Sequence, residues 1–247
     1  GIVRFGVVSD KGRVREINED SYKVISGREG LPDIFIVADG MGGHNSGEVA
    51  SRMAVDLSEE YLLKFLQPGL GEENILPFIC DMMTEVNRCI YSKAKESDEN
   101  FGMGTTFIIG MFFNGKFFIG HVGDSRVYLL RDGSLQRLTT DHSYIEELIK
   151  TGSLSREEAR NHPRKHVITR ALGCEENVDI DTYCVDVNSD DLFVLCTDGL
   201  TNMLSENDIL SIINSNDEPQ YICSELVKLA NERGGEDNIT VIIVKNS

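Results

Sequence analysis

The chain has 247 residues, 40% of them hydrophobic, and a formal net charge of −17. This length allows one domain with a sizeable core, and the acidic balance argues against nucleic-acid binding, which needs clusters of Lys and Arg. No run of about 18 apolar residues occurs, so we expect no membrane-spanning helix. The excess acid favours solubility, and some of the 41 acidic residues could also hold divalent cations, so both interpretations stay open.

Predicted strands occur along the whole chain. The first two are Val3–Val8 and Asp33–Ala38, and residues 105–113 then face residues 116–122 across Asn114-Gly115. Residues 126–130 follow, and Asp132-Gly133 reverses the chain. Because Asn-Gly and Asp-Gly tolerate positive φ, these turns predict an antiparallel meander. Later predicted strands are 182–185, 191–196 and 239–244.

Helical patterns lie between the strands. An apolar stripe at four-residue spacing, from Val49 to Phe65, predicts a helix that Ser46 could cap. Residues 79–94 and 220–230 show the same pattern. Strand clusters separated by helices predict an α+β fold, with helices outside antiparallel sheets. Residues 141–173 are polar and predict a helical insertion or flap over a surface.

The cysteines are scattered, and none forms a C-x-x-C pair. Most lie in apolar patterns, so we expect reduced, buried thiols in a cytoplasmic protein. The six are Cys80, Cys89, Cys174, Cys184, Cys196 and Cys223.

Acidic residues recur next to the predicted strands. They occur in Glu19-Asp20, Asp39-Gly40, Gly123-Asp124, Asp198-Gly199 and Glu236-Asp237. A lone Asp-Gly is usually a turn, but Asp39 and Asp198 come directly after apolar runs. Gathering carboxylates costs repulsion and desolvation, which a cation offsets. Oxygen ligands without His or Cys predict Mg²⁺ or Mn²⁺.

The chemistry expected of such a site is phosphoryl hydrolysis. Two metals that share one Asp would produce a bridging hydroxide suited to in-line attack on phosphorus. Arg15 lies four residues before Glu19. Its guanidinium group either binds two phosphate oxygens or is a surface charge, and the spacing alone leaves both interpretations open. The glycines beside the Asp residues would make room for the metal and its waters, and a glycine carbonyl can be a ligand.

At these residues the chain resembles the metal-dependent serine/threonine protein phosphatases, the protein phosphatase 2C family, in its bacterial form. The matching stretches, in chain order, are SDKGRVREINED, VADGMGGHNSGEVAS, GMGTT, GHVGDSRVYLLRDG, LTTDHS, ITRALG, CTDGL and GGEDNITVIIV. The resemblance runs from Ser9 to about Val244. It implies a four-layer αββα sandwich with a metal cleft at one edge of the sheets. It also implies one catalytic domain over residues 1–247, with a flap at about 141–173.

The resemblance also implies roles for individual residues. Asp39 matches a ligand that bridges two metals, and Asp198 and Asp237 match the other carboxylates of the first metal. Glu19 or Asp20, with the Gly40 carbonyl, matches the surroundings of the second metal. Arg15 matches a phosphate-binding arginine, and Asp124, with Asp198, matches the site of a third, weaker metal.

The implied activity is hydrolysis of phosphoserine and phosphothreonine on proteins, by direct attack of a metal-bridging hydroxide. The partners would be phosphorylated proteins, substrates of a Ser/Thr kinase, and the chain would be a monomer. One alternative is a non-enzymatic phosphoprotein-binding module, which loss of metal acids would mark; none is lost. Another is a phosphatase with a single dedicated substrate in a developmental or anti-anti-sigma circuit.

One position departs from the animal enzymes of this family. They carry a His directly after the Asp-Gly, proposed as the general acid for the leaving alcohol, and here that residue is Met41. His44 lies three residues later and does not inherit the role by position, so we interpret it as structural. A metal-bound water is the alternative proton donor, and the sequence does not decide this.

Overall fold

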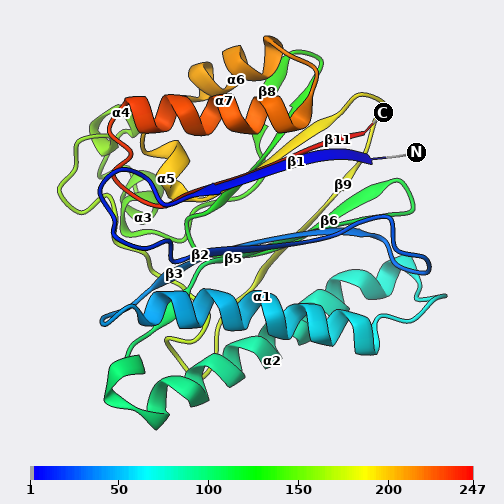
Figure 1. The fold of residues 1–247 in the computed structure, drawn as a ribbon, viewed down its shortest axis with the longest axis horizontal. Coiled ribbons are helices and arrows are strands. Elements are labelled where there is room, and N and C mark those ends of the chain that lie inside the picture. Colours follow the sequence, from blue (N-terminus) through cyan, green and yellow to red (C-terminus); the bar gives the residue numbers. More distant parts are fainter. Residues whose placement is uncertain (1–2, 247) are drawn as a thin grey trace.

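Two antiparallel sheets lie face to face, and helices cover the outer face of each (Figure 1). The computed structural model describes residues 3–246. One sheet has the order β1 (Val3–Asp10), β11 (Ile239–Asn246), β10 (Leu192–Cys196), β7 (Arg126–Arg131) and β8 (Ser134–Arg137). The other has the order β2 (Asp20–Ile25), β3 (Asp33–Met41), β5 (Phe107–Phe113), β6 (Lys116–Val122) and β9 (Asp181–Asp186), with β4 (Gly104–Thr105) paired to β3.

The helices complete the four layers. The long helices α1 (Ser46–Phe65) and α2 (Ile75–Glu96) pack on the β2–β9 sheet, and α6 (Glu206–Asn214) and α7 (Pro219–Glu232) lie on the opposite side of the sandwich (Figure 1). The short α5 (Asp198–Thr201) follows β10, whereas α3 (Tyr144–Lys150) and α4 (Arg156–Ala159) lie within residues 141–173. Single 3₁₀ turns occupy Glu72–Asn74 and Asp98–Asn100. The predicted αββα sandwich is confirmed.

Strand β3 shows how the core positions the site. Ile34 and Ile36 pack among the residues under α1 and α2, and Phe35 and Val37 pack between the two sheets. All four side chains are fully buried. Because side chains alternate along a strand, burial of both faces requires a continuous apolar run. The strand is thus held on both faces up to the residue before Asp39.

The predicted hairpin turns are confirmed, but the single meander is wrong. Asn114 and Asp132 both adopt left-handed backbone, with φ of 51° and 52°. The first turn joins β5 to β6 in one sheet, whereas the second joins β7 to β8 in the other. Gly123, at φ 114°, turns the chain out of the first of these sheets, so Asp124 lies at the crossing between the sheets.

Two details of α1 differ from the prediction. Asn45 in left-handed conformation is the N-cap, and Ser46 is the first helical residue, with a buried hydroxyl that has no hydrogen-bond partner. The buried face carries small residues, Ala50 and Ala54 among them, while Phe65 of the predicted stripe is 48% exposed. Small side chains let the first half of the helix approach the sheet closely, and Leu62 is buried further along the same helix.

The cysteine prediction holds in part. All six thiols are free, and Cys196 and Cys223 are buried. Cys174 and Cys184 are exposed, which corrects the expectation of buried thiols. Cys184 lies on β9, the outermost strand of its sheet, where one face of the strand is open to solvent.

Candidate active site

The acidic residues singled out from the sequence meet at one edge of the sandwich. They arrive from the end of β3, from the start of α5, and from the loops that precede β2, join β6 to β7 and precede β11. Together they line a cleft of about 370 Å³. The predicted residues in its wall are Arg15, Glu19, Asp39, Gly40, Asp124, Asp198 and Asp237. The topology therefore brings together side chains from distant parts of the chain, from Arg15 to Asp237.

Asp20 is placed differently from the other predicted residues. It stands opposite Asp39 in the β2–β3 register but lies behind the cleft wall, with 8% of its surface exposed. Its Oδ2 atom accepts hydrogen bonds from Thr240 Oγ1 at 2.7 Å and Thr197 Oγ1 at 3.2 Å. Of the pair Glu19 and Asp20, Glu19 lines the cleft and Asp20 supports it from below.

The carboxyl groups oppose one another's ionisation. Burial, together with the neighbouring Asp20 and Asp198, raises the pKa of Asp39 well above its usual range. Burial raises the pKa of Asp20 to about 7. Burial and the adjacent Asp198 likewise raise the pKa of Asp124 and of Asp237. A site that disfavours its own negative charge in this way needs a cation to keep the carboxylates ionised.

Glu19 lies beside the start of α1. Burial raises its pKa, although the backbone N–H groups of Glu48 and Gly47 at that helix terminus lower it in part. The helix terminus and its dipole favour a carboxylate there. Glu19 is thereby held at the cleft wall.

Several oxygens of the site have no hydrogen-bond partner. These are Glu19 Oε2, Asp20 Oδ1 and Asp198 Oδ1, all buried. A buried acceptor without a donor costs free energy, and native structures hold few of them. Unpartnered carboxylate oxygens at an acidic cleft are the donor set that Mg²⁺ and Mn²⁺ take. The residues present therefore fit divalent metal ions.

The glycines of the site are required by close backbone packing. A Cβ on Gly40 would lie 1.8 Å from the carbonyl oxygen of Gly47, and one on Gly199 would lie 1.9 Å from that of Asn238. The space beside Gly40 is therefore filled by the start of α1, not left open for a metal and its waters. The predicted role of Gly40 as a carbonyl donor does not depend on that space.

Asn238 connects the loops of the site through hydrogen bonds, and the sequence did not predict this role. It is 3% exposed, and its Oδ1 accepts the backbone N–H of Glu19 at 2.9 Å. Its Nδ2 donates to the carbonyl oxygens of Lys11 and Ile17, both at 2.9 Å. The Arg15 loop is thus fixed against the loop of Asp237. Only its place directly after Asp237 marked it in the sequence.

Thr106 is a second residue that the sequence did not single out. Its Oγ1 accepts the backbone N–H of Asp39 at 3.0 Å and lies 2.9 Å from Ser125 Oγ. It therefore bridges the strand end at Asp39 and the turn of Asp124. His166, from the 141–173 segment, also lines the cleft, and its Nδ1 lies 3.4 Å from Asn202 Nδ2.

Arg15 is the cation placed at the acidic wall. Its Nε lies 3.3 Å from Asp237 Oδ1, and its side chain is 54% exposed. Exposed ion pairs contribute little stability. The guanidinium therefore remains available to an anion that enters the cleft, which favours the phosphate-binding interpretation over a simple surface charge.

Residues 12–224 match the family described as Protein phosphatase 2C. The chain belongs to this family. It is 42% identical over 239 residues to the serine/threonine phosphatase stp of Listeria welshimeri, covering 97% of this chain and 94% of that protein. It is 35% identical to the protein phosphatase PhpP of Streptococcus pneumoniae, covering 98% and 97%.

Solved structures of protein phosphatase 2C relatives agree with the fold. The S. agalactiae serine/threonine phosphatase superposes with a TM-score of 0.91 at 34% identity, covering 99% of this chain and all of that one. The catalytic domain of the phosphatase PstP, solved in complex with two manganese ions, superposes with a TM-score of 0.84 at 32% identity, covering 99% and 98%. This chain is a metal-dependent protein-serine/threonine phosphatase. Within residues 3–246, none of the helices has the length and apolar character needed to cross a membrane.

Proposed function

We propose that the cleft at the sheet edge is the catalytic centre of this protein phosphatase 2C enzyme and holds two Mn²⁺ or Mg²⁺ ions. The observation that carries this is the pair of buried, unpartnered oxygens on Glu19 and Asp198 in a wall where burial and the neighbouring acids raise the pKa of Asp39. When bound, the two cations supply water activation and neutralise charge on the phosphoryl group. The reaction is phosphomonoester hydrolysis on phosphoserine and phosphothreonine side chains of proteins.

The carboxylates divide between the two ions. Asp39, at the rigid end of β3, is the residue shared by both, and Asp198 and Asp237 complete the first. Glu19 and the carbonyl of Gly40 hold the second. Asp20 acts from behind the cleft wall, because its Oδ2 is engaged by Thr240 and Thr197. Because β3 is paired on both sides and buried up to Ala38, Asp39 would offer its carboxylate to the ions from a fixed position.

A third, weaker metal is proposed between Asp124 and Asp198. Both residues line the cleft, and Asp198 is among the groups that raise the pKa of Asp124. A cation between them relieves this repulsion. Its affinity is expected to be lower, because only these two of the predicted carboxylates would hold it.

The chain's own residues orient the substrate. Arg15 exchanges its contact with Asp237 for a bidentate contact to two phosphate oxygens. Met41 lies in the cleft wall but has no proton to give to the leaving alcohol. Residues 141–173 form a flap whose His166 reaches the cleft, so the flap contacts residues that flank the phosphorylated side chain. We further propose that residues 1–247 act as one catalytic domain, monomeric and cytoplasmic, on substrates of a Ser/Thr kinase.

The test is turnover of a phosphothreonine peptide by protein stripped of metal. We expect no turnover in excess EDTA and full recovery on addition of Mn²⁺ beyond the chelator. Calorimetric titration should resolve two tight sites and one weaker site, and light scattering should give the mass of one chain. Full activity in excess EDTA, with no metal bound, would refute the proposed centre.

A further inference from the structure

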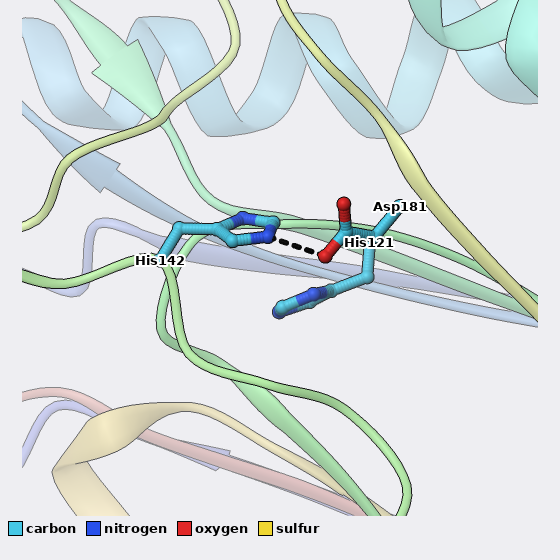
Figure 2. Close-up of side chains that lie close together, drawn as sticks. All are labelled: His121, His142 and Asp181. Atoms are coloured by element: carbon cyan, nitrogen blue, oxygen red, sulfur yellow. Dashed lines mark hydrogen bonds and ion pairs between the residues drawn. The ribbon is translucent and has the colours of Figure 1, made fainter. Parts of the chain in front are cut away.

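A second cluster of titratable residues lies outside the cleft wall and consists of His121, His142 and Asp181 (Figure 2). His121 on β6 and Asp181 on β9 are direct cross-strand partners, so their side chains leave the same face of the sheet. His142 comes from the segment that enters the flap. His121 and His142 are almost fully buried, and their rings lie 4.7 Å apart.

The hydrogen bonds of His142 decide what this cluster can do. The backbone N–H of Gly123 donates to its Nδ1 at 2.9 Å, which requires a lone pair on that nitrogen. The neutral ring therefore carries its proton on Nε2, which donates to Asp181 Oδ2 at 2.6 Å (Figure 2). Both ring nitrogens are used, so His142 has no lone pair left for a metal ion, although the ligand atoms of the cluster lie within 4.8 Å of one another.

The two histidines hold the residues on either side of Asp124. His121 Nε2 lies 2.9 Å from the carbonyl oxygen of Ser125 and donates to it, since that acceptor requires a proton on the nitrogen. The backbone N–H of His142 donates to the carbonyl oxygen of Gly123 at 2.9 Å, in addition to the bond at its ring. The turn that carries Asp124 is therefore fixed from both sides.

The same histidine closes the base of the flap. The backbone N–H of Thr169 donates to the carbonyl oxygen of His142 at 2.9 Å. Asp181, which orients the ring, accepts from Arg170 Nη1 at 3.1 Å and from Tyr183 Oη at 3.3 Å. One residue thus connects the end of the flap to the turn of Asp124.

We infer that His142, oriented by Asp181, is a positioning residue that holds the Asp124 turn in register with the base of the flap. The inference rests on the role proposed above for Asp124 at the weaker metal. Residues that orient metal ligands from behind contribute about 10- to 100-fold to metal affinity. We therefore expect the cluster to set the affinity of the weaker metal and to leave the two tight sites unchanged.

The first experiment uses metal-free protein and follows amide hydrogen exchange at Gly123. In H142N the amide oxygen lies close to the position of Nδ1 and can still accept the Gly123 N–H, whereas the longer side chain of H142Q can reach Asp181 but not serve Gly123. Exchange at Gly123 should be about 10-fold faster in H142Q than in H142N. N87A is the matched control, since buried Asn87 accepts the backbone N–H of Gly173 at 2.7 Å and does not line the cleft. It should leave Gly123 exchange unchanged.

The second experiment is calorimetric titration with Mn²⁺. The dissociation constant of the weaker site should rise about 10- to 100-fold in H142Q and in D181A, and should rise less in H142N. The tight sites in each variant, and all sites in N87A, should match wild type. This pattern separates positioning from general loss of stability, which would weaken every site.

Three results would overturn the inference. Folded H142Q and D181A that bind the weaker Mn²⁺ as wild type does would show that the turn needs no such support. Stoichiometric Zn²⁺ binding to the wild type, lost in H142Q and D181A, would make the cluster a metal site. A wild type that shows no weaker Mn²⁺ site would refute the third-metal role of Asp124 itself, and this is seen before any substitution is made.

Discussion

Asp20 and Asp39 stand directly opposite each other on the antiparallel strands β2 and β3. Like charges at such positions destabilise a sheet, and burial raises the pKa of both, that of Asp20 to about 7. In the metal-free protein, these two carboxyl groups therefore lower the stability of the fold at the edge where the cleft forms. Metal binding offsets this loss of stability, so stability and metal content should be linked.

The first prediction concerns the pH dependence of stability in metal-free protein. Because the pKa of Asp20 is raised from 3.8 to about 7, its contribution to stability is fully present below the unfolded value and is lost as pH rises through the folded one. Asp20→Asn keeps the neutral form at every pH. Its melting temperature relative to wild type should therefore increase from about pH 5 to about pH 8. Asp81→Asn, on the exposed surface of α2, is the control. A difference that is constant across this range would contradict the assignment.

The second prediction concerns Arg15, whose guanidinium faces the cleft beside Asp237. Arg15→Ala should lower kcat/KM for a phosphothreonine peptide by about 10- to 100-fold, mainly through KM, since charge-assisted hydrogen bonds contribute about 1.5–3 kcal/mol. Arg13→Ala is the matched control, because Arg13 Nε donates to the backbone oxygen of Asn231. Equal values of kcat/KM for the two variants would mean that Arg15 is only a surface charge.

The third prediction concerns Asn238, which joins the loops of Glu19 and Asp237. Asn238→Ala leaves the N–H of Glu19 without its acceptor and removes both donors to the Arg15 loop, so unfolding should become easier by about 2–4 kcal/mol. Mn²⁺ affinity should fall as well. Asn238→Asp keeps the acceptor for Glu19 but turns a carboxylate oxygen toward the carbonyl oxygens of Lys11 and Ile17 beside other acids, so it should lose at least as much stability, as measured by chemical denaturation. An Asn238→Ala protein that is as stable as wild type and binds Mn²⁺ as tightly would show that these hydrogen bonds do not support the site.

The fourth prediction compares Gly40, near the end of β3, with Gly43 in the loop that follows. An alanine at Gly40 would place its Cβ 1.8 Å from the oxygen of Gly47, whereas nothing lies within 4 Å of the same position at Gly43. Gly40→Ala must displace the start of α1 or the end of β3. It should therefore reduce both the melting temperature and Mn²⁺ binding, and Gly43→Ala should change neither. Similar behaviour of the two variants, in thermal melts with and without Mn²⁺, would exclude backbone packing as the reason for Gly40.

Much of this fold follows from local patterns in the sequence. Turns such as Asn114-Gly115 have a specific backbone requirement, and a strand buried on both faces, such as β3, needs a continuous apolar run. Strand β2 was not predicted, because Asp20, Ser21 and Lys23 interrupt its apolar residues. The sheet to which each hairpin belongs was also not predictable, since that depends on the crossing at Asp124 rather than on either turn.

Some residues of the site were predicted from the sequence, and others are recognised only in the structure. The acidic residues that line the cleft were predicted, because carboxylates directly after buried strands are unusual and because these residues lie in the family motifs. Asn238, Thr106 and His142 were missed because they bind backbone groups distant in sequence, and Asp181 was missed because its partner is the side chain of the distant His142. The sequence did not show which of Glu19 and Asp20 lines the cleft. Only the structure shows that Asp20 accepts hydrogen bonds from the hydroxyl groups of Thr197 and Thr240.

The measurement that tests the central claim most directly is the melting temperature of wild type and Asp39→Asn, each with and without saturating Mn²⁺. Asp39 is proposed to be shared by two cations while being repelled by its acidic neighbours. Metal-free Asp39→Asn should melt at or above metal-free wild type, because it removes a carboxyl group whose ionisation the folded state opposes. Mn²⁺ should raise the melting temperature of wild type much more than that of the variant, since binding to the folded state stabilises by mass action. A metal-free variant that melts well below wild type, with equal shifts by Mn²⁺ in both proteins, would show that Asp39 is a structural residue and that the metal centre lies elsewhere.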